Sequence, residues 1–330
     1  MKSRFTRRFS LLGIRIELIS NYSAILEDDE YFMSEGACLH SLLSNFHRLL
    51  PGDDAAGAEL QVQIDDDPGC SELTMVRENG LYRFRGPIRQ LETLAGDKRA
   101  AIFGNMGIFS KILVRELEMR GIFSFHSTSF VLPSTDRLVL VLGGSGAGKS
   151  TVLLRAVIAG LEIFGTELTH VQFREGGIRF LKGSLWQNCK MGNIVEDFPV
   201  LLDTFGIDSV PEGNPWKQYR SIDMRPWSHA ADWIDDPRVT ILFPRIEQER
   251  SRPERYTLSP EGIAYALYEN LSDKVSPPSL VYKQYFIPSL DSGDDQRRRM
   301  EAAQRFTREA RIDAVWKVLT NPDECLDTII

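Results

Sequence analysis

The sequence predicts an α/β protein, with a mixed sheet built around a glycine-rich loop and a smaller α+β domain before it. An apolar strand over 138–142 leads directly into the glycine-rich loop at 143–151, and a helical segment follows at 151–159. The earlier part of the chain instead alternates short strand-like runs with acidic, glycine-containing breaks. We therefore expect an N-terminal α+β domain over 1–120 and a loop-containing domain over 121–330.

The bulk composition is that of an ordinary globular protein, and it narrows the classes of partner. The chain has 330 residues, which suits one large or two ordinary domains. It has 39 lysines and arginines against 46 aspartates and glutamates, a net charge of −7, whereas surfaces that bind nucleic acid nonspecifically are basic. No apolar run approaches the ~18 residues needed to cross a bilayer. Nucleic acid and membrane are therefore not expected as partners.

The spacing of the cysteines indicates the cellular compartment of the protein. Four of them are scattered along the chain, and no two form a C-x-x-C pair. Such a pattern is typical of reduced thiols and not of disulfides or a zinc site. We therefore expect a cytoplasmic protein.

The N-terminal domain is expected to contain strands and two helices. Alternating or apolar runs bounded by turn residues predict strands over 14–19, 59–64 and 81–87. A helix is expected over 37–50, where a Pro-Gly pair ends it, and a second, amphipathic helix over 108–120 ends at a glycine. None of these segments carries a recognisable chemical motif, so the role of this domain stays open.

The second domain opens with two strands of a hairpin, 123–132 and 137–142, the second of which is apolar over 138–142 and so expected to be buried on both faces. The segment 161–171 after the loop helix predicts a further strand, and 239–243 another. Near the end, an arginine-rich run over 296–316 predicts a C-terminal helix with a largely solvated face.

The glycine-rich loop matches the phosphate-binding pattern G-x₄-G-K-[ST], preceded by a strand and followed by a helix. Its glycines let several backbone N–H groups converge on phosphate oxygens at a helix N-terminus. Lys149 is expected to reach the β- and γ-phosphates, and the Ser150 hydroxyl to complete a Mg²⁺ shell. The expected cofactors are therefore ATP and Mg²⁺, with the choice between ATP and GTP left open. The loop residues are Gly143, Gly144, Ser145, Gly146, Ala147, Gly148, Lys149, Ser150 and Thr151.

One carboxylate follows the loop at a suggestive distance. Glu167 lies 18 residues after Lys149, at a break in the predicted strand 161–171. A helix followed by a returning strand of this length can bring Glu167 back beside the phosphates. There it could hold the metal through water or take a proton from an attacking hydroxyl. An exposed glutamate at a strand edge is the alternative, and the spacing leaves both open.

The order of these features resembles that of the HPr kinase/phosphorylase superfamily, whose fold is related to ATP-dependent phosphoenolpyruvate carboxykinase. A histidine-bearing strand (His126), the strand 138–142, the loop 143–151, Gly160 and the pair Thr166-Glu167 follow one another at matching spacing. The family's acidic pair here has threonine in its first position. The resemblance covers roughly residues 121 to 260 and implies phosphoryl transfer from ATP to a hydroxyl, often that of a serine in a protein or peptide.

Roles for individual residues follow from this resemblance. Lys149 would stabilise the charge on the transferring phosphoryl group, and Glu167 would act as the base or support the metal. His126 would touch the γ-phosphate or the acceptor, although a histidine on an apolar strand can equally be a hydrogen-bonded core residue. Arg225, in a faint echo of the family's acidic-x-Arg element, is the preferred clamp for a phosphate or acidic acceptor. A surface ion pair with Asp223 is its alternative.

The leading hypothesis is an ATP-dependent kinase acting on a hydroxyl of a small molecule or of a serine-containing peptide or protein. A second hypothesis is a nucleotide-binding regulatory module with slow ATPase activity, read by a partner protein. A third is a carboxykinase-like lyase, which would need several arginines and a second set of metal ligands that the sequence does not reveal. The acceptor and the oligomeric state, a homo-oligomer included, stay open.

Overall fold

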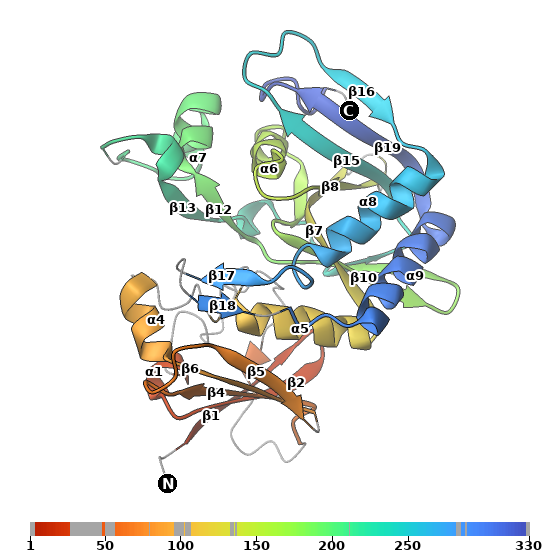
Figure 1. The fold of residues 1–330 in the computed structure, drawn as a ribbon. Helices are drawn as coiled ribbons and strands as arrows, with labels where there is room; N and C mark the ends of the chain where they lie inside the picture. Colours follow the sequence, from red (N-terminus) through yellow and green to blue (C-terminus); the bar gives the residue numbers. More distant parts are fainter. Residues whose placement is uncertain are drawn as a thin grey trace. The chain divides into compact units, whose positions relative to one another are not determined.

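The computed structural model of the chain describes residues 4–26, 48–49, 57–78, 80–95, 102, 107–132, 135, 137–210, 212–281, 285–287 and 289–327. Contacts divide the chain into two compact units (Figure 1). Unit 1 consists of Met1–Met119 and Lys274–Ser292, and unit 2 of Arg120–Asp273 and Gly293–Ile330. The expected domain over 121–330 was continuous, whereas residues 274–292 leave unit 2 and belong to unit 1.

Unit 1 is built on a mixed sheet with the strand order β3-β1-β2-β4-β6-β5. Strand β4 pairs in parallel with β2 and β6, and the other pairs are antiparallel. The predictions of strands over 14–19, 59–64 and 81–87 are confirmed by β2, β4 and β6. Most of the helix expected over 37–50 lies outside the described residues, and 48–49 form a strand instead. The strands are β1 (Phe5–Leu11), β2 (Ile14–Ser20), β3 (Arg48–Leu49), β4 (Leu60–Asp66), β5 (Thr74–Glu78), β6 (Leu81–Gly86), β17 (Ser279–Val281) and β18 (Tyr285–Ile287).

The helices of unit 1 are α1 (Ser23–Leu26), α4 (Ile88–Ala95) and α5 (Ile108–Met119). The prediction of a helix over 108–120 is confirmed by α5, but its polar side chains are buried as well as its apolar ones. Lys111 Nζ donates to the carbonyl of Pro277 at 2.6 Å, in the segment that returns to unit 1. Arg115 donates to the Tyr82 hydroxyl, which donates to Glu116, both at 2.6 Å. Pairing of this kind offsets the cost of burying charged groups.

Unit 2 contains a nine-stranded mixed sheet in the described part of the chain, with the order β14-β11-β10-β7-β8-β15-β19-β16 and with β9 paired to β7. Strands β8, β15 and β19 are parallel to one another, and the remaining pairs are antiparallel. The hairpin predicted from 123–132 and 137–142 is confirmed by β7 and β8. The sheet strands are β7 (Ile122–Leu132), β8 (Arg137–Leu142), β9 (Glu162–Gly165), β10 (Leu168–Arg174), β11 (Gly177–Leu181), β14 (Trp233–Asp235), β15 (Arg238–Ile246), β16 (Glu254–Thr257) and β19 (Arg311–Thr320).

Helices cover both faces of this sheet. Helix α6 (Lys149–Ile158) packs on the face that carries Val139 and Val141. Helices α8 (Pro260–Ser272) and α9 (Gly293–Glu309) pack side by side on the opposite face, against Leu138, Leu140 and Leu142 (Figure 1). Both sets of alternate side chains of β8 are therefore buried from Leu138 onward, which explains why the strand is apolar from Leu138 to Leu142.

A small ribbon and several short helices complete unit 2. Strands β12 (Trp186–Lys190) and β13 (Tyr219–Asp223) pair antiparallel. The short helical segments are η1 (Asn193–Asp197), α7 (Leu201–Thr204), η2 (Pro215–Lys217) and η3 (Arg225–Trp227).

The C-terminal prediction of one helix over 296–316 is wrong in its second half. Helix α9 ends at Glu309, and β19 then pairs in parallel with β15 and antiparallel with β16. The reason is tertiary: the exposed Arg311, Asp313 and Lys317 alternate with more buried residues, and the sheet supplies partners on both sides. None of the helices in the described ranges is long and apolar enough to span a bilayer.

Candidate active site

The parallel strands bring the glycine-rich loop to one edge of the unit 2 sheet. Strand β8 ends at Leu142, the loop follows, and α6 begins at Lys149. Because parallel strands share the same carboxyl edge, the ends of β15 and β19 lie at this edge too. On the other side of β8, Ser127 of β7 pairs with Leu142. His126 therefore lies one position beyond the end of β8, at the edge where the loop starts.

The loop backbone requires glycine at two positions. Gly143 has a φ of +152°, and a Cβ there would lie 2.7 Å from the Ala147 Cβ. Gly148 has a φ of +100°, and its Cβ would lie 2.2 Å from Cγ1 of Ile246, at the end of β15. No side chain caps the N-terminus of α6. The first N–H groups of a helix have no partner within the helix, so this N-terminus has donors of the kind that anion sites use.

Three side chains of the loop helix have defined polar contacts. Lys149 is buried, and its Nζ donates to the carbonyls of Gly143 and Gly144 at 2.6 and 3.0 Å. The Ser150 hydroxyl accepts a hydrogen bond from Gln187 Nε2 at 3.1 Å. The Lys149 side chain thus folds back over the loop, and its ammonium group contacts loop carbonyls at the place where phosphate oxygens would bind.

The hydroxyl of the next residue, Thr151, also accepts a hydrogen bond from an amide side chain. Thr151 Oγ1 accepts from Asn193 Nδ2 at 3.4 Å, and Thr151 is buried. Gln187 and Asn193 were not singled out in the sequence, because an isolated glutamine or asparagine gives no spacing signal. The structure assigns them to the support of the loop helix.

Glu167 lies in the break between β9 and β10, as expected from the sequence. Both strands pair with β7, so the break falls beside Ser127, whose N–H donates to the Glu167 carbonyl at 3.1 Å. The Glu167 side chain is only 16% exposed, and its Oε1 lies 3.1 Å from His126 Nε2. Glu167 is therefore not the exposed strand-edge glutamate of the alternative interpretation.

His126 is held by three groups. Its Nε2 faces Glu167, its Nδ1 hydrogen-bonds the Asp273 carboxylate, and its carbonyl accepts from Asn270 Nδ2 at 3.0 Å. The residue is 4% exposed. The imidazole thus lies between two carboxylates at the edge where the loop begins. Asp273 and Asn270 were missed in the sequence because they follow His126 by more than 140 residues, at the end of a helix that was not predicted.

The Thr166 side chain is buried against two backbone carbonyl oxygens. Its Oγ1 lies 3.0 Å from the Ser184 carbonyl oxygen and 2.7 Å from that of Trp186, and the residue is buried. Its own carbonyl accepts from Thr128 Oγ1 at 2.8 Å. A hydroxyl donor suits this position, whereas a carboxylate would face two carbonyl oxygens. Thr166 therefore joins the break after β9 to the segment that leads into β12.

We expect Thr166→Asp to destabilise unit 2 by about 3 kcal/mol or more, because a buried carboxylate would lose hydration without gaining a donor. Thr166→Val, which keeps the shape and removes the hydrogen bond, should cost about 1 kcal/mol. Urea unfolding of the two variants measures both values. A Thr166→Asp protein as stable as the wild type would contradict this assignment.

Arg225 follows the β12–β13 ribbon and pairs with Asp223. Its Nη2 donates to Asp223 at 2.8 Å and its Nε at 3.0 Å, while the guanidinium lies 5.5 Å from the centre of the Trp186 ring. The ion pair that the sequence left as an alternative is therefore present. Trp186 precedes Gln187, which contacts Ser150, so Arg225 contacts the ribbon that also carries a support of the loop helix.

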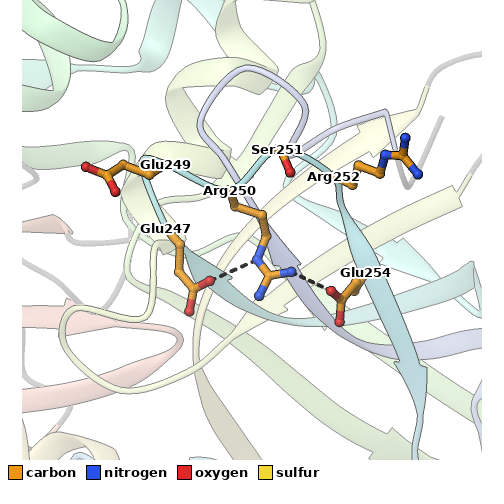
Figure 2. A pocket seen from close by; sticks show the side chains of 6 residues that line it. All are labelled: Glu247, Glu249, Arg250, Ser251, Arg252 and Glu254. Carbon is orange, nitrogen blue, oxygen red and sulfur yellow. Dashed lines mark hydrogen bonds and ion pairs between the residues drawn. The ribbon is translucent and has the colours of Figure 1, made fainter.

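A polar pocket follows β15, directly after the isoleucine that packs on Gly148 (Figure 2). Figure 2 shows Arg250 between two carboxylates. Its Nε donates to Glu247 at 2.8 Å and its Nη1 donates to Glu254 at 2.7 Å. These hydrogen bonds raise the pKa of Arg250 and leave its charge compensated. The pocket is suited to a polar ligand and does not present Arg250 as a free phosphate clamp. It is lined by Glu247, Glu249, Arg250, Ser251, Arg252 and Glu254.

Metal binding at this site would depend on few protein ligands. Within the described ranges, no group of three or more histidine, cysteine, aspartate or glutamate side chains is arranged to hold a metal. An all-protein metal cage is therefore not found in this part of the chain. Mg²⁺ carried by a nucleotide needs only one or two protein ligands, since phosphates and waters complete its shell. A serine hydroxyl and a carboxylate, as in Ser150 and Glu167, fit that donor set.

A comparison of the chain with models of protein families gives no match. A comparison with curated protein sequences gives no match either.

Proposed function

We propose that unit 2 is an ATP-dependent kinase, which transfers the γ-phosphoryl group to a hydroxyl of a small molecule or of a serine in a peptide or protein. One observation carries the proposal: the loop 143–151 and the Glu167–His126 pair are assigned to the same edge of the sheet by strand register. The loop has the chemistry to bind phosphates, and the carboxylate has the chemistry to accept a proton. The resemblance to HPr-kinase-like proteins implies the same division of roles.

Phosphate binding would use the backbone and one cation. The N–H groups of 144–150 and the dipole of α6 favour a polyphosphate at the helix N-terminus. Lys149 Nζ, which contacts the carbonyls of Gly143 and Gly144, lies on the loop that would surround the phosphates. Its positive charge stabilises negative charge on the transferring group, and such stabilisation supplies much of the catalysis of phosphoryl transfer.

Mg²⁺ would be held by Ser150 together with phosphate oxygens and water. The Ser150 oxygen has two lone pairs, and the N–H of Gln187 uses one of them. Bound there, Mg²⁺ supplies charge neutralisation for the β- and γ-phosphates. If another group acts as the general base, Glu167 is the carboxylate that would hold Mg²⁺ through a water molecule.

Glu167 is the proposed general base. Its carboxylate takes the proton of the acceptor hydroxyl as the oxygen bonds to the γ-phosphorus, and the bond from that phosphorus to the bridging oxygen of ADP breaks. His126 holds the carboxylate through the 3.1 Å contact between Nε2 and Oε1. Arg225, which follows the ribbon that carries Gln187, is the proposed cation for an acidic acceptor.

The acceptor class can be found with γ-labelled ATP, Mg²⁺ and a fractionated extract of the source cells, with Lys149→Ala as the blank. We expect label in a metabolite or a polypeptide with the wild-type protein and none with the variant. If label appeared only in free phosphate in reactions that contain the same extract fractions, the proposal of a kinase would be contradicted. Such a result would favour the regulatory module with slow ATPase activity.

A further inference from the structure

We propose that the polar pocket after β15 receives the nucleoside of the bound nucleotide, and that Glu249 accepts hydrogen bonds from the ribose hydroxyls. The inference rests on the proposed function, because it concerns the nucleotide whose phosphates the loop 143–151 would bind. It adds a second part to that site, for the sugar and the base, on the β15 side of the loop (Figure 2).

The sheet order determines on which side of the loop the nucleoside would lie. Strand β8, which leads into the loop, lies between β7 and β15. His126 is on β7, and Glu167 lies between β9 and β10, which both pair with β7. The γ-phosphate has to face these two side chains, because Glu167 is the proposed base for the attacking hydroxyl. The opposite end of the triphosphate, which carries the nucleoside, is then directed toward β15.

The pocket begins where β15 meets the loop. Ile246 is the last residue of β15, and its Cγ1 lies 2.2 Å from the position that a Cβ on Gly148 would take. The next residue, Glu247, lines the pocket, and its N–H donates to the Thr320 carbonyl at the end of β19 at 2.8 Å. The pocket therefore starts beside the first turn of α6, where the phosphates would bind.

A chain of hydrogen bonds also connects the pocket segment to the loop helix. Asn193 Nδ2 donates to Thr151 Oγ1 at 3.4 Å and to Asp197 Oδ2 at 2.8 Å. The other carboxylate oxygen of Asp197 accepts from Gln248 Nε2 at 2.5 Å. Because Gln248 directly precedes Glu249, these contacts fix the position of the pocket segment relative to the first turn of α6.

The pocket is large enough for a nucleoside, and its lining favours a neutral ligand that donates hydrogen bonds. Its volume is about 580 Å³, which falls within the range of small-molecule sites. Three glutamates and two arginines line it, so the excess of negative charge disfavours a further phosphate group there. An ionised carboxylate only accepts hydrogen bonds, and the hydroxyls of a ribose supply donors without adding charge.

Glu249 is the carboxylate of this pocket that is available to a ligand. Glu247 and Glu254 both accept from Arg250, and Glu254 also accepts from the Tyr256 hydroxyl. Within the described ranges, no hydrogen bond or ion pair involves the exposed carboxylate of Glu249. Its two oxygens match the two adjacent hydroxyls of a ribose, and dinucleotide-binding folds hold a ribose hydroxyl with a carboxylate in the same way.

The test is a calorimetric titration with three probes, each with Mg²⁺: a non-hydrolysable ATP analogue, its 2′,3′-dideoxy counterpart and inorganic triphosphate. We expect the wild-type chain to bind the ribose-containing analogue about tenfold more tightly than the dideoxy analogue. In Glu249→Ala this ratio should fall to about twofold or less, with the affinity for inorganic triphosphate within about twofold of the wild type.

Glu301→Ala is the matched control, because Glu301 is an exposed glutamate on α9, which covers the opposite face of the sheet from α6. It should keep the wild-type ratio between the two analogues. The inference would be overturned if the wild-type ratio persisted in Glu249→Ala.

Inorganic triphosphate separates a failure of this inference from a failure of the proposed function. It has the phosphates that the loop would bind and lacks the sugar and the base. Equal affinity of the wild type for all three probes would support phosphate binding by the loop and overturn the nucleoside pocket. Absence of binding by every probe would overturn the proposed function and this inference together.

Discussion

Lys149→Ala is expected to lower the rate of nucleotide-dependent phosphoryl transfer by about 10³-fold or more. The substitution removes the one charged side chain of the loop, whose ammonium group would stabilise the negative charge of the phosphoryl group in the transition state. It also removes the two hydrogen bonds that the ammonium group makes to the carbonyls of Gly143 and Gly144. Initial rates with label in the γ-position of ATP measure the loss.

Lys190→Ala is the matched control for this experiment, because Lys190 is an exposed lysine on β12. It should retain wild-type turnover. Full turnover in Lys149→Ala would remove the loop from the mechanism and with it the whole assignment. Circular dichroism of both variants shows whether the sheet and helices are intact.

Glu167→Gln should lower transfer by about 10²–10³-fold while leaving the affinity for nucleotide nearly unchanged. The amide has the shape of the carboxylate and can still hydrogen-bond His126, but it cannot accept the proton of a hydroxyl. The measurement is kcat against acceptor, together with the dissociation constant of a non-hydrolysable ATP analogue.

A second carboxylate–histidine pair in unit 2 supplies the control for Glu167. Glu162, on β9, pairs with His229 through an Oε2–Nδ1 distance of 2.5 Å, and its side chain is 43% exposed. Glu162→Gln should therefore leave transfer intact. Equal losses of binding and transfer in Glu167→Gln would reduce Glu167 to a metal-supporting or structural residue.

The parts of the fold that could be predicted are those specified by local sequence. The strand, loop and helix of 138–159 are recognisable because glycine, lysine and serine each have a local physical requirement in a phosphate loop. The break at Glu167 could be predicted too, since two strand-like runs flank it. Nothing local distinguishes the two interpretations of Glu167, and its burial beside His126 becomes visible only when β10 pairs with β7.

The remaining features depend on contacts between distant residues. Asp273 and His126 are 147 positions apart, and no periodicity connects them. Strand β19 follows an arginine-rich helix, and its strand conformation depends on the hydrogen bonds that β15 and β16 offer. The return of 274–292 to unit 1 involves a backbone carbonyl, that of Pro277, which has no signature in a side-chain pattern. Tertiary context determines each of these features.

The central claim is that the loop 143–151 binds a nucleoside triphosphate with Mg²⁺, and calorimetric titration tests it most directly. A non-hydrolysable ATP analogue is titrated into the wild-type chain with and without Mg²⁺, and into Lys149→Ala as the control. We expect saturable binding at one site, strengthened by Mg²⁺ and lost in a folded Lys149→Ala protein. Absence of binding to the wild type, with analogues of both ATP and GTP, would contradict it, as would equal affinity in Lys149→Ala.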